Sequence, residues 1–392
     1  MGHDQIKINR VREAMRNEGF DVLLLRIPEN VVYISDAWCG QGLTYLVFPL
    51  EKDPILIYPA SEVPPCTWVS DVREYSTETP DRLSDTLEVG GNFVQKALTD
   101  IGMSSGTVGV EQSWELVAGT YSRYEVNVMG EHTLSALKKK ITDCKWKNAS
   151  SLLIKARAIK TPNEVRMLRK ANEVAEIGLR IFDHNMKPGL TEIQLATSIE
   201  HEIVTGGILK HRTNRVIACA FVASGSTTAD AHKYAFGSTS RKLRHGDLVM
   251  LELDVIADGY SSDITRTFVV GKPSKLQKRL FEAVLDSQTT AISGIKPNIA
   301  AAEIARVSND VIRRHGFSEY LVHGLGHGIG VAVHEPIPTL HLESNDLLRP
   351  GMVHSIEPGI YGRRIGGVRI EDDILDTERG TEYLSTYTRI PE

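Results

Sequence analysis

The sequence predicts a mixed α/β protein of two domains, and three observations support that prediction. Helix-like and strand-like segments alternate along the first 150 residues, which is the pattern of an α/β domain. Two strongly marked helix starts follow at Thr161 and Thr191, where a second domain would begin. The length of 392 residues suits two or three domains of about 150 residues each. We therefore place one domain at residues 1–150 and the other at residues 151–392.

The composition is that of a globular protein with no marked affinity for nucleic acid or membranes. Hydrophobic residues make up 41% and charged residues 24% of the chain, and the formal net charge is −5. These values exclude disordered and collagen-like classes, and the weakly acidic balance gives no electrostatic footprint for nucleic acid or anionic lipid. No apolar stretch approaches the ~18 residues of a membrane helix, and the first residues lack a signal-peptide core. The four cysteines lie far apart, so we expect reduced thiols and a cytoplasmic location.

The first domain shows the alternation element by element. Ile8, Val11 and Met15 recur at helical spacing and predict an amphipathic helix at the start. Apolar, β-branched runs then predict strands, and one further stretch predicts a helix. The strands are expected at 21–25, 31–34, 44–48, 54–58 and 107–111, and the helix at about 83–98. No combination of catalytic residue types occurs here, so we expect a structural or interface domain.

The second domain begins with two helices whose starts are marked by capping boxes. Thr161 and Glu164 form the first box, with Pro162 at the first helical position. Thr191 and Gln194 form the second box. Each box precedes apolar residues at helical spacing, so we expect two amphipathic helices in succession.

An acidic hairpin follows these helices. Apolar residues flank Asp258 and Gly259, a strong signal for a two-residue turn. Glu252 and Asp254 lie two residues apart and share one strand face, and we expect Asp263 on the return strand to face Glu252. A solvent-exposed acidic face is the simpler interpretation. However, the neighbours are apolar, and buried carboxylates must be paired or bound to metal.

Three further segments carry residues suited to chemistry. His323, His327 and His334 lie among glycines that allow close approach, and their spacing does not match a phosphate-binding loop. Glu357 ends an apolar strand, and Arg369 and Glu371 are expected on one face of another strand. The candidate metal ligands are Glu252, Asp263, His327, Glu357 and Glu371. This oxygen-rich set suits one or two divalent ions of Mn, Co, Fe or Zn, and bridging carboxylates favour a pair of ions.

The second domain resembles the pita-bread metallopeptidase family, which includes prolidase, aminopeptidase P and methionine aminopeptidase. The resemblance covers about residues 155–390 and rests on motifs that occur in order. They are Val222 with His232, Asp263 with Arg266, His323 with His327, His334 with Glu335 and Pro336, Glu357 with Tyr361, and Arg369 with Glu371. The first domain resembles, more weakly, the creatinase/prolidase N-terminal domain, which methionine aminopeptidases lack. The prolidase and aminopeptidase P branch therefore fits better.

The resemblance implies a hydrolase of Xaa-Pro peptide bonds, of dipeptidase or aminopeptidase type, that acts on short peptides as a homodimer. Asp263, His327, Glu357 and Glu371 match metal ligands. In such enzymes a metal-activated hydroxide attacks the scissile carbonyl, and the glutamate matching Glu357 handles its proton. The remaining matches carry catalytic or substrate roles. His334 matches the histidine that steadies the tetrahedral intermediate, His232 one near the scissile nitrogen, and His323 and Arg369 residues that contact the substrate.

Position 252 departs from the family pattern. The first metal ligand of the family is an aspartate eleven residues before the match to Asp263, and here that position holds Glu252. We expect Glu252 to face the metals but to bind one ion weakly or not at all, and Asp254 could compensate. The departure leaves open a non-peptidase hydrolase or lyase of a small metabolite, since creatinase, ectoine hydrolase and dimethylsulfoniopropionate lyase share the fold. A catalytically inactive binding module is a third alternative, and the retained histidines and glutamates argue against it.

Overall fold

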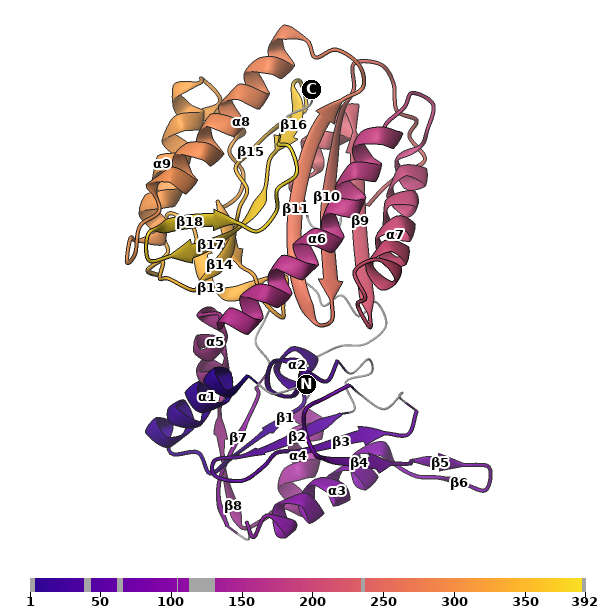
Figure 1. The fold of residues 1–392 in the computed structure, drawn as a ribbon, viewed down its shortest axis with the longest axis vertical. Helices are drawn as coiled ribbons and strands as arrows, with labels where there is room; N and C mark the ends of the chain where they lie inside the picture. The colour runs from indigo at the N-terminus through magenta and orange to yellow at the C-terminus, as the bar shows by residue number, and fades with distance from the viewer. Residues whose placement is uncertain are drawn as a thin grey trace. The chain divides into compact units, whose positions relative to one another are not determined.

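The protein consists of two compact units, Met1–Arg157 and Ala158–Glu392, and each is described by itself. The computed structural model describes residues 4–38, 44–61, 66–103, 105–112, 131–233 and 237–389. Helices and strands are mixed in both units, so the predicted α/β class is confirmed (Figure 1). Within the described residues, no helix combines the length and apolar character needed to cross a membrane.

The first unit is built on a six-stranded mixed sheet in the order β4-β3-β2-β1-β7-β8. Its strands are β1 Val22–Leu25, β2 Tyr45–Pro49, β3 Ile55–Pro59, β4 Asp71–Tyr75, β7 Gly106–Val110 and β8 Cys144–Asn148, with a small hairpin of β5 Glu78–Thr79 and β6 Arg82–Leu83. Its helices are α1 Gln5–Glu18, α2 Pro28–Ser35, α3 Thr86–Asp100, α4 Glu131–Lys140 and α5 Ser150–Ala158. A buried cluster joins Leu24 and Val47 of the sheet to Leu98 of α3 and Leu137 of α4. The sheet and these two helices thus share one core.

The strand predicted at 31–34 is wrong, because these residues belong to helix α2. The carboxylate of Glu111, at the end of β7, accepts hydrogen bonds from the backbone N–H groups of Arg26 and Ile27, at 2.7 and 3.1 Å. It also accepts one from the side chain of Asn30, at 2.9 Å. These bonds satisfy N–H groups that a helix start leaves open, and Pro28 suits the first turn. A contact from far along the chain therefore overrides the local β propensity of the segment.

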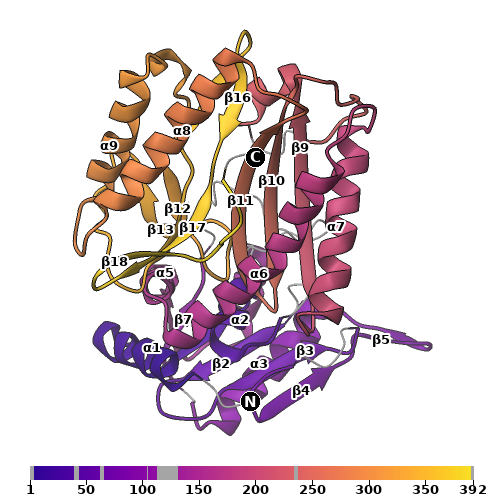
Figure 2. The same ribbon diagram turned by 45° about the horizontal axis from the view of Figure 1, so that its top comes forward.

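The described residues of the second unit form three sheets. Their orders are β11-β10-β9, β13-β12-β14-β17-β18 and β15-β16. The strands are β9 Val216–Ser224, β10 Leu248–Ala257, β11 Tyr260–Val269, β12 Gly326–Gly328, β13 Glu335–Leu340, β14 Val353–Ile356, β15 Gly359–Gly362, β16 Gly366–Arg369, β17 Asp372–Thr377 and β18 Gly380–Tyr383. The helices are α6 Pro162–Asn185, α7 Glu192–Leu209, α8 Lys275–Gly294 and α9 Ala301–Arg314, with short 3-10 turns η1 Gly225–Asp230 and η2 Ser318–Tyr320. Figure 2 shows α6 and α7 along the sheet of β9, β10 and β11, and α8 beside α9.

Helices α6 and α7 begin where the sequence predicts. The Thr161 hydroxyl accepts from the Glu164 backbone N–H at 3.2 Å, and the Glu164 carboxylate accepts from the Thr161 N–H at 3.0 Å. Thr191 and Gln194 form the same reciprocal pair at the start of α7. Both predicted capping boxes are therefore confirmed.

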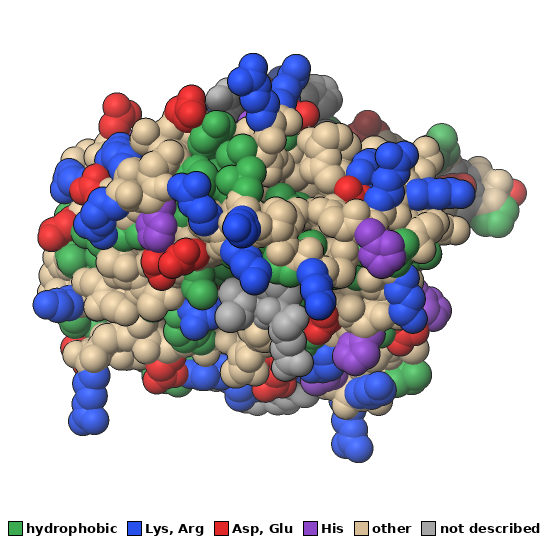
Figure 3. Space-filling model, turned by 90° about the horizontal axis from the view of Figure 1, so that it is seen from above, with side chains coloured by type: hydrophobic (Ala, Val, Ile, Leu, Met, Phe, Trp, Pro, Cys, Tyr) green, Lys and Arg blue, Asp and Glu red, His purple; other side chains and the backbone are tan. Residues whose placement is uncertain are grey.

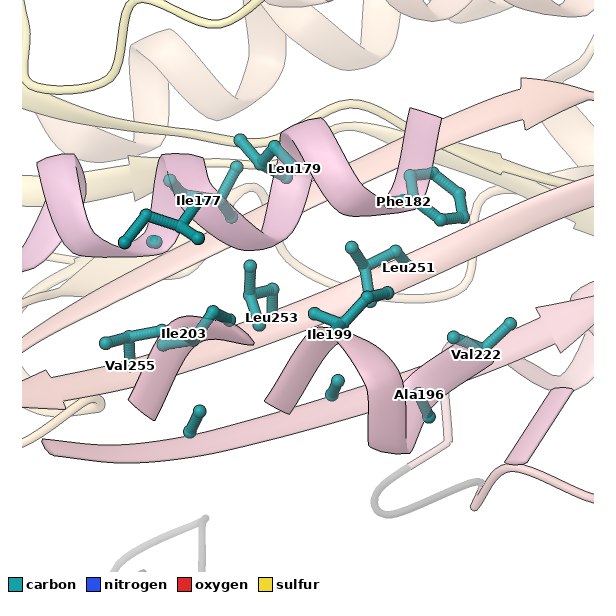
Figure 4. Close-up of a cluster of buried hydrophobic side chains, with 14 of the residues drawn as sticks. Ile177, Leu179, Phe182, Ala196, Ile199, Ile203, Val222, Leu251, Leu253 and Val255 are labelled. Atoms are coloured by element: carbon teal, nitrogen blue, oxygen red, sulfur yellow. The ribbon is translucent and has the colours of Figure 1, made fainter. Parts of the chain in front are cut away.

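The helices that cover strand β10 determine which of its two faces is buried in the core. Leu251, Leu253 and Val255 pack against Ile199 and Ile203 of α7 and against side chains of α6 (Figure 4). Burying each of these side chains contributes about 1.5–3 kcal/mol, so a one-residue slip of the strand would be very costly. Since side chains alternate along a strand, Glu252 and Asp254 must lie on the opposite face.

The register of the β10–β11 hairpin corrects one expectation. Asp263 pairs with Asp254, whereas Glu252 pairs with Thr265. The two-residue turn at Asp258 and Gly259 makes Ala257 the partner of Tyr260, which fixes every later pair. The pairing of Glu252 with Asp263 expected from the sequence is therefore wrong, because Glu252 lies two residues farther from the turn than Asp254, the actual partner of Asp263.

The strand expected to carry Arg369 and Glu371 is interrupted. Arg369 ends β16, which pairs with β15, and Asp372 begins β17, which pairs with β14 and β18. The chain changes partners between them, which ends one ladder and starts another. Even so, Arg369 Nε lies 3.8 Å from Glu371 Oε2, so the two side chains point to the same side as predicted.

The surface seen in Figure 3 carries charges of both signs. Basic side chains stand out from this face with acidic and hydrophobic side chains between them. Over the whole sequence the balance is 45 Lys and Arg against 50 Asp and Glu.

Candidate active site

The acidic face of β10 and β11 meets the histidine and glutamate segments of the second unit. Three overlapping groups of side chains each bring potential metal-binding atoms within 4.8 Å of one another. The groups are Asp263, His327 and His334; His327, Glu357 and Glu371; and Glu252, Asp254 and Asp263. All five predicted metal ligands therefore lie in one cluster, together with Asp254, which the sequence offered as a compensating ligand, and His334.

Backbone contacts hold the two halves of the cluster together. The Glu371 N–H donates to the Thr265 carbonyl at 3.1 Å, and the Asp263 N–H donates to the Asp373 carboxylate at 3.2 Å. The Asn172 side chain of α6 donates to the same Asp373 oxygen at 2.9 Å. The acidic face of the hairpin is thus held against β17 by buried hydrogen bonds.

Glycines let the His327 segment approach its neighbours. A Cβ on Gly326 would overlap the backbone oxygen of Ser355, and one on Gly328 would overlap that of Ile337. Strand β12 lies between β13 and β14, so only a residue without a side chain fits at these two positions. The alternating glycines therefore serve to bring His327 close to the carboxylates.

His327 has the protonation state of a metal ligand. Its Nδ1 lies 3.0 Å from the Gly328 carbonyl oxygen, which can only accept, so Nδ1 carries the proton. Nε2 then presents its lone pair toward Asp263 Oδ2 at 3.4 Å and Glu357 Oε1 at 3.6 Å. Burial lowers the pKa of His327 to about 4, which keeps the ring neutral at pH 7. Metal-binding histidines use this arrangement, with the second nitrogen donating to a carbonyl or carboxylate.

The carboxylates are buried together and repel one another. Burial raises the pKa values of Asp263, Glu357 and Glu371, and for the first two the charges of Glu371 and Asp254 add to the rise. Asp263 Oδ1 is buried without a hydrogen-bond partner among the described residues. A divalent cation would satisfy this oxygen and offset the repulsion, so these residues fit a metal site of hard oxygen and imidazole donors.

Thr265 connects three charged groups of the site. Its Oγ1 lies 2.7 Å from Glu252 Oε2, 2.6 Å from Glu371 Oε2 and 2.8 Å from Arg369 Nε. A hydroxyl has one proton and two lone pairs, so it accepts from the guanidinium and donates to one carboxylate at a time. Thr265 thereby fixes the positions of Glu371 and Arg369 relative to β11.

Arg369 begins a hydrogen-bonded chain along the other side of the cluster. Its Nη1 donates to the Tyr361 hydroxyl at 2.8 Å, and that hydroxyl lies 3.1 Å from His323 Nε2. His323 Nδ1 donates to the Gly324 carbonyl at 2.7 Å, so Nε2 accepts the Tyr361 proton. The guanidinium Nη2 forms an ion pair with Glu252. The substrate contact that the resemblance implies for Arg369 stays a prediction, and in the structure its guanidinium pairs with a carboxylate of the cluster.

The two remaining predicted histidines flank the cluster. His334 stacks on His327 with ring centroids 3.9 Å apart, and burial, reinforced by His327, lowers the pKa of His334 to about 2. His232 follows η1, and its ring lies 5.1 Å from the Tyr361 ring. The catalytic and substrate roles expected of these histidines stay predictions.

Comparison with known proteins now identifies the family. The model of metallopeptidase family M24 matches residues 166–378, and the creatinase/prolidase N-terminal domain matches residues 7–159. An Xaa-Pro dipeptidase of Pyrococcus horikoshii is 36% identical over 383 residues, which cover 98% of this chain and 97% of that one. The chain belongs to metallopeptidase family M24. The predicted family and fold, a creatinase-like N-terminal domain followed by a pita-bread catalytic domain, are confirmed.

Other proteins align with this M24 enzyme along nearly its whole chain. A putative dipeptidase of Bacillus subtilis, YkvY, is 30% identical over 389 residues, covering 98% of both chains. The solved structure of an Xaa-Pro dipeptidase from Bacillus anthracis aligns with a TM-score of 0.80 at 28% identity, covering 98% of this chain and 99% of that one. Membership in a metallopeptidase family means that the chain is an enzyme and implies the use of a divalent metal.

Sequence reasoning missed two polar residues of the M24 site. Tyr361 belongs to the motif that carries Glu357, but nothing in the sequence places its hydroxyl between Arg369 and His323. Thr265 was overlooked because the register was placed two residues off. A turn-based count from Asp258 would have put Thr265 opposite Glu252.

Proposed function

We propose that this M24 enzyme hydrolyses Xaa-Pro peptide bonds in short peptides with the help of divalent metal. The observation that carries the proposal is the neutral His327 lone pair directed at the buried carboxylates of Asp263 and Glu357, a cluster that needs a cation. The relatives named Xaa-Pro dipeptidase, which align along nearly the full chain, support the substrate class.

The metal would be held by Asp263, His327, Glu357 and Glu371, together with one carboxylate of β10. That carboxylate belongs to Glu252 or to Asp254. When bound, the metal supplies Lewis acidity and lowers the pKa of water, so that a hydrolytic nucleophile is available at neutral pH. The protein groups must then bind the peptide, exclude bulk water and move one proton from the nucleophile to the leaving nitrogen.

Glu357 is suited to carry that proton. Its Oε1 accepts a hydrogen bond from Ser355 Oγ at 3.3 Å, which orients the carboxylate. Burial raises its pKa, and a raised pKa brings a carboxyl group closer to the value at which it can both take and give a proton near pH 7. His334 stays neutral and can donate one hydrogen bond to an oxygen that gains charge. His232, His323 and Arg369 line the other side, where we place the substrate.

The test is hydrolysis by protein that has been stripped with a chelator and reloaded with Mn, Co or Zn. We expect Ala-Pro to be cleaved only after reloading and Ala-Ala to be cleaved far more slowly. Adding a tripeptide of the form Xaa-Pro-Yaa distinguishes dipeptidase from aminopeptidase use. Glu357→Gln should lower kcat by about 100-fold or more, the scale of lost proton transfer. Equal activity of the stripped and reloaded protein would contradict the proposal.

A second candidate is a non-peptidase hydrolase or lyase of a small metabolite. The observation that favours it is the ion pair of Arg369 with Glu252, because a guanidinium already neutralised is a poor receptor for a peptide carboxylate or carbonyl. Release of product from creatine, ectoine or dimethylsulfoniopropionate by protein that does not cleave any Xaa-Pro dipeptide would favour this candidate.

We also propose manganese as the metal, a homodimer in solution and a cytoplasmic location. These points depend on the family resemblance and on the widely spaced cysteines. Metal analysis of purified protein and sedimentation of the full chain would test the first two.

A further inference from the structure

We propose that the β10 carboxylate of the metal site has moved from position 252 to Asp254, and that Glu252 serves instead as the fixed partner of Arg369. This inference rests on the proposed metal dependence, but it concerns which of two acidic residues binds the ion. The sequence already offered Asp254 as a compensating ligand, and the inference now assigns it that role and gives Glu252 a different one.

Glu252 already forms an ion pair with the buried guanidinium of Arg369. Arg369 is buried, with 5% of its surface exposed, and a buried guanidinium without a partner is strongly unfavourable. Its Nη2 forms the ion pair with Glu252, whereas its closest approach to Glu371 is 3.8 Å. The hydroxyl of Thr265 holds Glu252 Oε2 in the same place, at 2.7 Å. A metal that recruited Glu252 would have to draw it away from both partners.

The groups other than Glu252 that accept hydrogen bonds from Arg369 are neutral. Nη1 donates to the carbonyl of Ala231 at 3.2 Å and to the hydroxyl of Tyr361 at 2.8 Å, and both of these acceptors are neutral. Nε donates to Thr265, also neutral. Among the described residues, Glu252 is therefore the carboxylate within hydrogen-bonding distance of Arg369, and Glu371, 3.8 Å from Nε, adds a second and longer ion pair.

Asp254 is placed where a metal ligand is needed. It lies directly across the hairpin from Asp263, and opposite residues of an antiparallel pair have Cβ atoms about 4.5–5.5 Å apart. The potential ligand atoms of Asp254, Asp263 and Glu252 all lie within 4.8 Å of one another, and of the two β10 carboxylates Asp254 is the one opposite Asp263. Asp254 is 4% exposed, and Asp263 Oδ1 beside it is buried and has no hydrogen-bond partner among the described residues. Two opposed short carboxylates can bind one cation from both strands.

Side-chain length favours the same division. Metal sites tolerate deviations of only about 0.2 Å in ligand distance, and glutamate is longer than aspartate by a methylene group. The longer glutamate side chain at position 252 reaches Arg369, and the shorter aspartate side chain at position 254 stays on the hairpin opposite Asp263. The two residues thus act together: Asp254 supplies the ligand, and Glu252 supplies the counter-ion.

The experiment compares two matched amide variants, Asp254→Asn and Glu252→Gln. Both residues lie on one face of one strand, and each change removes a charge at nearly constant volume. Mn²⁺ binding to chelator-stripped protein is measured by calorimetry, and the Co²⁺-loaded forms are compared by visible absorption. We expect Asp254→Asn to weaken Mn²⁺ binding by at least about tenfold, the scale of losing even a supporting group, and to change the Co²⁺ spectrum. Glu252→Gln should keep both the Mn²⁺ affinity and the spectrum while raising KM for the substrate.

Three results would overturn the inference: loss of Mn²⁺ in Glu252→Gln alone, equal loss in both variants, or loss in neither. If Asp254→Asn does not fold, the Mn²⁺ position in crystals of the wild-type protein decides, since anomalous scattering shows which carboxylate touches the ion. Bonding to Asp254 supports the inference, and bonding to Glu252 overturns it. These readouts are independent of turnover, so a failure of the proposed Xaa-Pro activity would be seen separately.

Discussion

Replacing Thr265 with valine tests whether one hydroxyl organises the active site. The side chain is completely buried, and its Oγ1 lies within 2.8 Å of Arg369 Nε and within 2.7 Å of Glu252 and Glu371. Valine has nearly the same volume, so the change creates no cavity and removes only the hydrogen bonds. The Thr265→Ser variant is the matched control, because it keeps the hydroxyl and loses only a methyl group.

The magnitude follows from the bonds that are lost. A hydrogen bond to a charged group contributes about 1.5–3 kcal/mol, and a buried donor left without an acceptor costs about 1–3 kcal/mol. With partial relaxation of Arg369, we expect Thr265→Val to lower the free energy of unfolding by about 2–4 kcal/mol. For a unit of this size that corresponds to a fall in Tm of about 5–15 °C. Misplacement of Glu371 and Arg369 should also lower kcat/KM by about tenfold to 100-fold.

The assay is thermal unfolding followed by circular dichroism on chelator-stripped protein, so that metal loss does not contribute, with Xaa-Pro hydrolysis measured after reloading. Thr265→Ser should retain most of the stability and activity. The reasoning would be refuted if valine behaved like the wild type and serine were the worse of the two. That result would mean that packing of the methyl group, rather than the hydroxyl, holds the site.

Three further predictions follow from the core, from the buried carboxylates and from the first unit. Leu253→Ala should destabilise the second unit by about 2–5 kcal/mol, because it opens a cavity under α6 and α7. Chemical denaturation monitored by circular dichroism measures this loss, and a loss below about 1 kcal/mol would contradict the assignment of Leu253 to the buried face of β10. Burial raises the folded-state pKa values of Asp263 and Glu357, so the stability they give metal-free protein is present at low pH and is lost as the pH rises. Mn²⁺ should therefore raise Tm more at pH 8 than at pH 5.5, and an equal rise at both would show that these carboxylates do not bind it. Burial raises the pKa of Glu111 to about 7, so its contribution to folding is complete below the unfolded value of about 4.5 and is lost as the pH rises through 7. All four tryptophans precede residue 158, so tryptophan fluorescence reports unfolding of the first unit. Glu111→Gln should make the stability of this unit fall less steeply between pH 5 and pH 8. An unchanged slope would assign the pH dependence to other groups.

The parts of the fold that local sequence determines were the parts that could be predicted. The starts of α6 and α7 depend on residues three apart, and the β10–β11 hairpin depends on the turn at Asp258 and Gly259. Helix α2 could not be predicted in this way, because its start is stabilised by Glu111, which is more than 80 residues away in the chain.

The site residues were predicted better than their contacts. The residue types and motif spacing indicated the cluster of carboxylates and histidines, because such residues are too costly to bury separately. The partners of Arg369 depend on where three separate strands converge, and no pattern within one segment encodes that convergence. The sequence offered Asp254 as compensation for Glu252, but the position of Asp254 opposite Asp263 and the ion pair of Glu252 with Arg369 depend on the register and on where Arg369 lies.

One titration tests the central claim, that this metal site performs Xaa-Pro hydrolysis. Chelator-stripped protein is reloaded stepwise with Mn²⁺, and bound metal and Ala-Pro hydrolysis are measured in the same samples. We expect no hydrolysis without metal, a rise of activity in step with bound metal, and saturation of both at the same ratio of metal to protein. Full hydrolysis in samples that hold almost no metal, or saturation with metal without any cleavage of Ala-Pro or other Xaa-Pro dipeptides, would contradict it.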